Sequence, residues 1–177
     1  MSSSKFLLLD ANVVIELFAR GLWDKVIKRL EICLAATILG EAQYYENDNG
    51  ERQYFDLQEY ANQGKVTTLS MFPSEVTSFK GLFTRPYLEK LDAGEAESLA
   101  YIVKHKEQDI QLCSADKIVY RVLGALDLGD KAISLEEILH AIGYGRKLHH
   151  QYSTAYREQW TKKGFTEGFT GMGLRKP

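Results

Sequence analysis

Cysteine is scarce in this sequence, and it has no long apolar run and no strong excess of one charge sign. The only two cysteines, Cys33 and Cys113, each lie in an apolar run typical of a buried strand. We interpret both as reduced core thiols and expect neither a disulfide nor a metal pair. The apolar run at residues 6–9 is far shorter than a signal-peptide core or a membrane span. We therefore expect a cytoplasmic protein with no membrane association.

The composition is that of an ordinary globular protein, with 45% hydrophobic and 26% charged residues, which excludes disordered, collagen-like and membrane classes. A chain of 177 residues is long enough for one domain with a core of its own. The net charge of −2 is unevenly distributed, because the first 142 residues carry −7 and the last 35 carry +5. An acidic body repels a polyanion unless cations intervene, whereas a basic tail attracts one.

Short apolar runs alternate with longer amphipathic segments, a pattern typical of an α/β protein with a mostly parallel sheet. Strands are expected at residues 5–9, 32–36, 65–69, 110–113 and 131–133. Helices are expected over residues 12–19, 22–30, 38–46, 54–62, 73–84, from 92 to about 105, 116–126 and 134–143, with Asn12, Thr37, Asp92, Ser114 and Ser134 at their N-termini. We predict a three-layer α/β/α sandwich with a central parallel sheet of about five strands.

The segment after residue 143 differs from the rest in composition. Large apolar side chains recur there at every fourth position: Leu148, Tyr152, Tyr156 and Trp160. This spacing predicts an amphipathic helix over residues 146–162, and the four glycines among the last 14 residues predict a loop or flexible tail. The helix could bind single-stranded RNA through its aromatic and basic residues. The stripe favours a helix that docks on the body or on a second subunit instead.

Three acidic residues follow predicted strands, where a parallel α/β sheet places its ligand site. Asp10 comes directly after the first strand, Glu41 lies about one helical turn beyond the second, and Asp116 comes three residues after Cys113. Taken singly, Glu41 is read as a surface acid and Asp116 as a helix-dipole residue. Asp10 is the hardest to explain structurally, because a carboxylate that ends a buried strand is costly without a partner.

A further acidic group opens the helix that contains the sequence DAGEAESLA. On a helical wheel Glu95 borders the apolar stripe, whereas Glu97 is expected to face solvent. Asp92 shares the face of Glu95, and the two either join the acidic cluster or form only a capping box.

Carboxylates that converge in one pocket repel each other, so hard cations are needed to neutralise them. Oxygen ligands favour Mg²⁺ or Mn²⁺. Two such ions about 3.5–4 Å apart can activate a water and stabilise the leaving oxygen in phosphodiester hydrolysis. The pattern therefore predicts a metal-dependent nuclease.

Four segments resemble, in order, the motifs of the PIN-domain family. They are LLLDANVVIELF at residues 7–18, ILGEAQYY at 38–45, LDAGEAESLAYIV at 91–103 and LCSADKIVYRVL at 112–123. Order and spacing agree over roughly residues 5–143. The third segment departs from the family, because it offers Asp92, Glu95 and Glu97 in place of a lone aspartate. We expect a PIN-like nuclease domain over residues 1–143, with the basic aromatic helix and tail over 144–177 outside the matched core.

The resemblance implies roles for individual residues. The catalytic, metal-binding acids would be Asp10, Glu41, Glu95 and Asp116, with Asp92 as a further metal ligand. Asn12 and Ser114 would support metal-bound water, although both also fit a pure helix-capping role. PIN domains are Mg²⁺- or Mn²⁺-dependent ribonucleases, many of them toxins of toxin–antitoxin pairs and often dimeric. An RNA substrate, an antitoxin partner and a homodimer are therefore expected.

Two other classes of function remain open. One is a receiver-like signalling module that accepts a phosphoryl group on one aspartate of the acidic pocket. The other is a catalytically silent scaffold that keeps the fold for partner binding.

Overall fold

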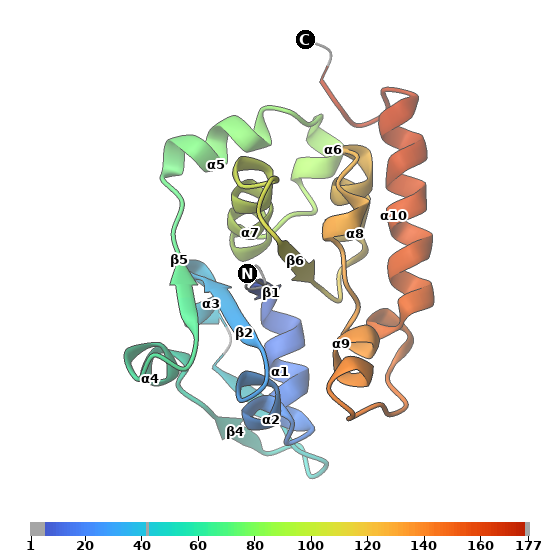
Figure 1. The fold of residues 1–177 in the computed structure, drawn as a ribbon. Helices are drawn as coiled ribbons and strands as arrows, with labels where there is room; N and C mark the ends of the chain where they lie inside the picture. Colours follow the sequence, from blue (N-terminus) through green and yellow to red (C-terminus); the bar gives the residue numbers. More distant parts are fainter. Residues whose placement is uncertain (1–5, 42, 176–177) are drawn as a thin grey trace.

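The computed structural model describes residues 6–41 and 43–175, and they form an α/β fold around one parallel sheet (Figure 1). The strands pair in the order β5, β2, β1, β6, with bounds β1 (Phe6–Leu9), β2 (Glu31–Ala35), β5 (Thr67–Leu69) and β6 (Ile110–Cys113). Strands β1, β2 and β6 are almost entirely buried, as expected for parallel strands covered on both faces. Helices flank the sheet, so the predicted three-layer α/β/α fold is confirmed.

The strand order reverses beside β1. Strands β2 and β5 are added on one side of β1, while β6 pairs with its other side. Leu9 lies opposite Cys113, and the Asp10 amide donates to the Cys113 carbonyl at 3.0 Å, so the two strands end together. Ligands of open parallel sheets bind beyond the carboxyl ends of the strands at such a reversal. The residues that follow β1 and β6 therefore occupy the expected ligand crevice.

The helices alternate with the strands, and α7 and α1 lie on opposite sides of the sheet (Figure 1). Their bounds are α1 (Ala11–Ala19), α2 (Trp23–Ile27), α3 (Ala36–Glu41), α4 (Leu57–Asn62), α5 (Pro73–Lys80), α6 (Arg85–Leu88), α7 (Ala93–Lys104), α8 (Lys117–Ala125), α9 (Leu135–Ala141) and α10 (Thr154–Phe169), with 3-10 turns η1 (Gly129–Lys131) and η2 (His150–Tyr152). Among the described residues, no helix combines the length and apolarity that crossing a membrane requires.

Several elements differ from the sequence-based prediction, two of them close to the sheet. The fifth strand, expected at residues 131–133, is reduced to one bridge between Ala132 and Leu112, because η1 takes up Lys131. The helix expected over residues 38–46 ends at Glu41, and the chain then forms a hairpin of β3 (Tyr44–Glu46) with β4 (Arg52–Tyr54). Three-residue strands carry too little period-two pattern to be recognised in a sequence.

Three of the five predicted N-caps were wrong, each by a short distance. Asp10, not Asn12, occupies the N-cap position of α1, and Asp116, not Ser114, caps α8. The third predicted cap, Thr37, lies inside α3. Asp92 and Ser134 were predicted correctly, and each forms a reciprocal capping box with the glutamate three residues later.

The boundaries predicted for the C-terminal segment were wrong at both ends of the helix: residues 146–153 are not part of the α-helix, and the predicted loop is helical over residues 164–169. Helix α10 begins at Thr154 and continues to Phe169, through Gly164 and Gly168. It runs along α8 on the outside of the molecule (Figure 1). A Cβ built on Gly164 would lie 2.0 Å from the Arg121 carbonyl oxygen, and one on Gly168 would lie 2.3 Å from the Ala125 carbonyl oxygen. These glycines allow close backbone contact between two helices, and the docking that the aromatic spacing favoured is observed.

Candidate functional site

Asp10 and Asp116, far apart in the sequence, are joined by the hydroxyl of Ser114. Asp10 is 3% exposed and does not cap its own helix. Its Oδ2 instead accepts a hydrogen bond from Ser114 Oγ at 2.9 Å, and Ser114 Oγ accepts one from the Asp116 amide at 3.0 Å. Asp116 Oδ1 accepts from the Ile118 amide at 3.0 Å. The ends of β1 and β6 thus hold two carboxylates about one buried serine.

The acids of α7 complete the cluster. Asp92 Oδ1 accepts from the Glu95 amide at 2.8 Å, and Glu95 Oε2 accepts from the Asp92 amide at 3.1 Å. This capping box fixes both side chains at the helix N-terminus, with Asp92 exposed and Glu95 only 4% exposed. The sequence analysis treated helix capping and membership of the acidic cluster as alternatives for Asp92 and Glu95. In the structure, both residues cap α7 and also belong to the cluster.

The carboxylates are close enough to oppose each other's ionisation. Burial raises the pKa of Asp10 to about 6; the Ser114 hydrogen bond opposes the rise, and the charges of Asp92 and Asp116 add to it. Burial also raises the pKa of Glu95 to about 8, helped by the charges of Asp10, Asp92 and Asp116. Both shifts disfavour negative charge, so a bound positive charge would stabilise the ionised cluster.

Glu41 lies at the end of α3, beside the N-terminus of α7. Burial and the charge of Asp92 raise the pKa of Glu41, whereas a hydrogen bond from the Gly94 amide lowers it. A Cβ on Gly94 would lie 2.8 Å from Glu41 Oε2 and 2.9 Å from Ile38 Cγ1. Glycine at position 94 therefore allows α3 to bring Glu41 up to the acidic end of α7.

The prediction that Glu97 faces solvent was wrong. Glu97 is 7% exposed, and its carboxylate accepts hydrogen bonds from the Thr37 amide at 3.1 Å and the Met71 amide at 3.0 Å, as well as from the Thr37 hydroxyl. Thr37 follows β2 and Met71 follows β5, so Glu97 ties these two strand ends to α7. The helical wheel failed because α7 is covered on its second side by α3 and α5.

Tyrosines that the sequence analysis did not assign to the site surround it. The Tyr120 hydroxyl donates to the Ser114 carbonyl at 2.7 Å and accepts from the Ser114 amide at 3.2 Å, which fixes the loop that carries Asp116. The Tyr152 hydroxyl donates to the Asn12 carbonyl at 3.4 Å. Asn12 itself is exposed in the first turn of α1. The four-residue spacing that includes Tyr152 indicated packing, and nothing in the sequence indicated the polar contacts of Tyr120 and Tyr152.

The described side chains do not form a finished ligand set. Within residues 6–41 and 43–175, no three carboxylates, imidazoles or thiols converge as the ligands of a metal ion do. Asp92 and Asp116 each direct one oxygen to an amide of their own helix. Binding an ion would require other oxygens of the cluster to turn toward it.

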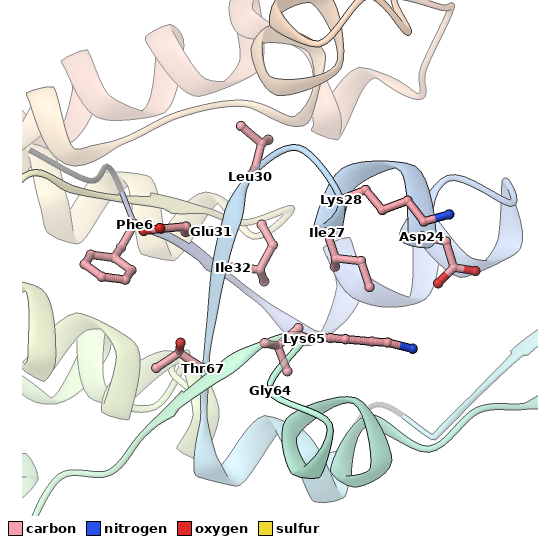
Figure 2. A pocket seen from close by; sticks show the side chains of 11 residues that line it. Phe6, Asp24, Ile27, Lys28, Leu30, Glu31, Ile32, Gly64, Lys65 and Thr67 are labelled. Atoms are coloured by element: carbon pink, nitrogen blue, oxygen red, sulfur yellow. The ribbon is translucent and has the colours of Figure 1, made fainter. Parts of the chain in front are cut away.

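The hollow shown in Figure 2 lies elsewhere. It has a volume of about 500 Å³ and lies at the amino ends of β1, β2 and β5, next to Phe6, Ile32 and Thr67. None of the predicted site residues lines it. The acidic cluster and this hollow therefore occupy opposite edges of the sheet.

Comparisons with known protein families, curated proteins and solved structures gave no match to this chain.

Proposed function

We propose that this chain is a Mg²⁺- or Mn²⁺-dependent endoribonuclease that hydrolyses phosphodiester bonds of single-stranded RNA. The observation that carries this proposal is that Ser114 links the Asp10 carboxylate to the backbone amide of Asp116. The charges of both aspartates also raise the pKa of Glu95. Such a group of mutually repelling, partly buried carboxylates at the strand-order reversal is costly without a positive ligand. The similarity of four segments to PIN-domain motifs supports the same conclusion.

The residues fit a hard divalent cation. The donor set consists of carboxylate and hydroxyl oxygens, and the raised pKa values of Asp10 and Glu95 indicate an unbalanced negative charge. Asp10, Glu95 and Asp116 would hold the ion, with Glu41 and Asp92 at the exposed side of the cluster. A cation bound there would supply an activated water and a positive charge for the leaving oxygen of a phosphodiester.

The protein positions these carboxylates through a second layer of hydrogen bonds. Ser114 orients Asp10, and Tyr120 holds the backbone of Ser114 on both its donor and acceptor sides. The capping box orients Glu95 against the N-terminus of α7. Such supporting contacts fix the ligand geometry before the substrate binds.

Cleavage of a labelled single-stranded RNA tests the proposal. Wild type should cleave with Mn²⁺ or Mg²⁺ and not with EDTA. Loss of a residue that only orients a metal ligand reduces activity by about 10–100-fold. Asp10→Asn and Asp116→Asn should each reduce the cleavage rate by more than this. In both variants the side chain keeps an oxygen that can accept the hydrogen bond from Ser114 or from the Ile118 amide. Asp130→Asn is the matched control, since its side chain is 73% exposed in η1.

Equal cleavage by wild type and both cluster variants would contradict the assigned roles. The two other classes have separate readouts. Labelling of an aspartate by acetyl phosphate would favour a receiver-like module. Calorimetry without heat of divalent-ion binding, on a folded protein, would favour a silent scaffold.

Ser114→Ala tests the supporting layer by itself. This change removes the donor that lowers the pKa of Asp10, so that pKa should rise further. We expect the Mn²⁺ affinity to fall by about 10–100-fold, which is the typical loss when a residue that orients a metal ligand is removed. Titration of Mn²⁺ followed by electron paramagnetic resonance measures it. An unchanged affinity would show that Ser114 serves only the loop, and Ser114→Thr, which keeps the hydroxyl, is the control.

The toxin role that the family resemblance implies is a separate part of the proposal. Induced expression of wild type should then arrest growth, and Asp10→Asn should not. Co-expression of the product of a neighbouring small reading frame should restore growth if that product is an antitoxin.

A further inference from the structure

The aromatic side chains of the C-terminal region lie along one side of the acidic cluster. The ring of Tyr156 packs edge-on against Tyr120 and Trp160, with centroids 6.3 and 6.1 Å away. Burial and the Asp116 charge raise the pKa of the Tyr156 hydroxyl, and a hydrogen bond from the Lys117 amide lowers it. Tyr156 therefore lies directly beside the start of α8, where Asp116 is placed.

The ammonium groups of two lysines lie over the indole ring of Trp160. Lys117 Nζ lies 5.3 Å and Lys163 Nζ 5.1 Å from the ring centroid, within the range of cation–π attraction. Both lysines are exposed, and Trp160 is partly exposed. In the part of the chain that the structure describes, neither lysine forms an ion pair, whereas the neighbouring Arg157 pairs with Glu137.

Trp160 packs only partly against the core, at the border of the contact between α10 and α8. The docking face is made by glycines, since a Cβ on Gly124 would lie 2.1 Å from the Thr161 carbonyl oxygen and one on Gly164 would meet the backbone of Arg121. Trp160 and its two lysines lie beside this contact, and Lys117 directly follows Asp116 in the chain. A polyanion that approaches the acidic cluster needs positive charge at that border.

We propose that Trp160, Lys117 and Lys163 form a binding platform for single-stranded RNA beside the acidic cluster. An unpaired base would stack on the indole, and the two ammonium groups would bind the phosphates on either side of it. A partly exposed aromatic ring with flanking cations is an arrangement that proteins use to bind unpaired strands without reading their sequence. The placement of the strand beside a cleavage site rests on the proposed nuclease function, but binding to the platform is measurable without cleavage.

The test is fluorescence anisotropy of a labelled, unstructured 12-nucleotide RNA, with the full chain in EDTA. Trp160→Leu should weaken binding about 10–100-fold, as expected for loss of one stacked base, and Trp160→Phe should recover most of the affinity. Lys117→Gln and Lys163→Gln should each reduce the slope of log affinity against log salt by about 0.7. All variants should retain the wild-type circular dichroism spectrum.

Matched controls lie on another face of the same helix. Lys162 and Phe165 line a separate hollow together with Asp127 and Asp130. Lys162→Gln makes the same charge change as Lys163→Gln, and Phe165→Leu makes a comparable loss of an exposed ring. Both should bind RNA as wild type does. An RNA duplex of the same length should bind more weakly than the single strand, because its bases are not free to stack.

The platform is overturned if wild type does not bind the single strand, or if Trp160→Leu and both lysine variants bind as tightly as wild type. The platform is also overturned if Trp160→Leu weakens binding of the duplex as much as binding of the single strand. Cleavage that requires Asp10 but is indifferent to Trp160 and the lysines would retain the nuclease and remove the platform. Binding that requires Trp160, without any metal-dependent cleavage, would retain the platform and remove the nuclease.

Discussion

Replacing Gly164 with alanine is expected to lower the melting temperature of the protein by roughly 6–12 °C. Alanine is the better helix former by about 1 kcal/mol. The new Cβ would, however, lie 2.0 Å from the Arg121 carbonyl oxygen and 2.7 Å from Arg121 Cα. Backbone atoms cannot move aside by changing rotamer, so α8 and α10 must separate. We expect a cost at or above the upper end of the about 1–3 kcal/mol typical of overpacking.

Gly124→Ala should behave alike, because its Cβ would lie 2.1 Å from the Thr161 carbonyl oxygen on the facing helix. Gly145→Ala is the control, since its nearest neighbour would be His140 Cδ2 at 3.7 Å, an ordinary contact. Thermal unfolding followed by circular dichroism measures all three. Melting temperatures of Gly164→Ala and Gly124→Ala within a degree or so of that of Gly145→Ala would refute the close contact of α8 with α10.

Glu95→Gln is expected to stabilise the protein at pH 8 in EDTA while it reduces metal-dependent cleavage. The pKa of Glu95 is raised from 4.5 to about 8 in the folded state. Its ionisation therefore lowers the free energy of unfolding progressively as the pH rises from about 4.5 to 8, and the loss is complete above that window. The amide removes this charge and keeps an acceptor for the Asp92 amide. The gain should be on the order of a few kcal/mol at pH 8 and vanish near pH 4.

The control is two residues away on the same helix. Glu97 is equally buried, but its carboxylate accepts from two backbone amides and a hydroxyl. Glu97→Gln should therefore destabilise the fold by about 1–3 kcal/mol, because the amide nitrogen cannot accept a hydrogen bond. Urea unfolding at pH 4 and pH 8 compares the two. Destabilisation by Glu95→Gln at pH 8 would show that its charge is not opposed in the fold.

The parts of the fold that depend on long, regular patterns could be predicted from the sequence. The four buried or edge strands of the sheet, the start of α7 at Asp92 and the capping box of α9 all follow from apolar runs and short-range capping chemistry. The positions of Asp10 and Asp116 after buried strands were predicted by the same reasoning. The structure shows that these strands are adjacent and links the two residues through Ser114. Their service as metal ligands remains a prediction.

What could not be predicted depends on contacts between distant segments. The inward direction of Glu97 requires knowing that Thr37 and Met71 present amides on the second side of α7. Gly164 and Gly168 indicated a loop because glycine disfavours isolated helices, whereas their four-residue spacing serves a close approach to α8. Close helix packing outweighs local propensity here, and one sequence does not reveal which partner helix makes it possible.

The close contact between α8 and α10 also has a consequence for the order in which parts of the molecule form during synthesis. Arg121 of α8 forms a two-pronged ion pair with Glu167, near the end of α10, while Asp116 lies at the start of the same α8. During synthesis, α8 is added to the chain before Glu167. The support that α10 gives to α8 is therefore complete only after α10 has been translated, and on the proposed function a shorter nascent chain would hold an incompletely supported acidic centre.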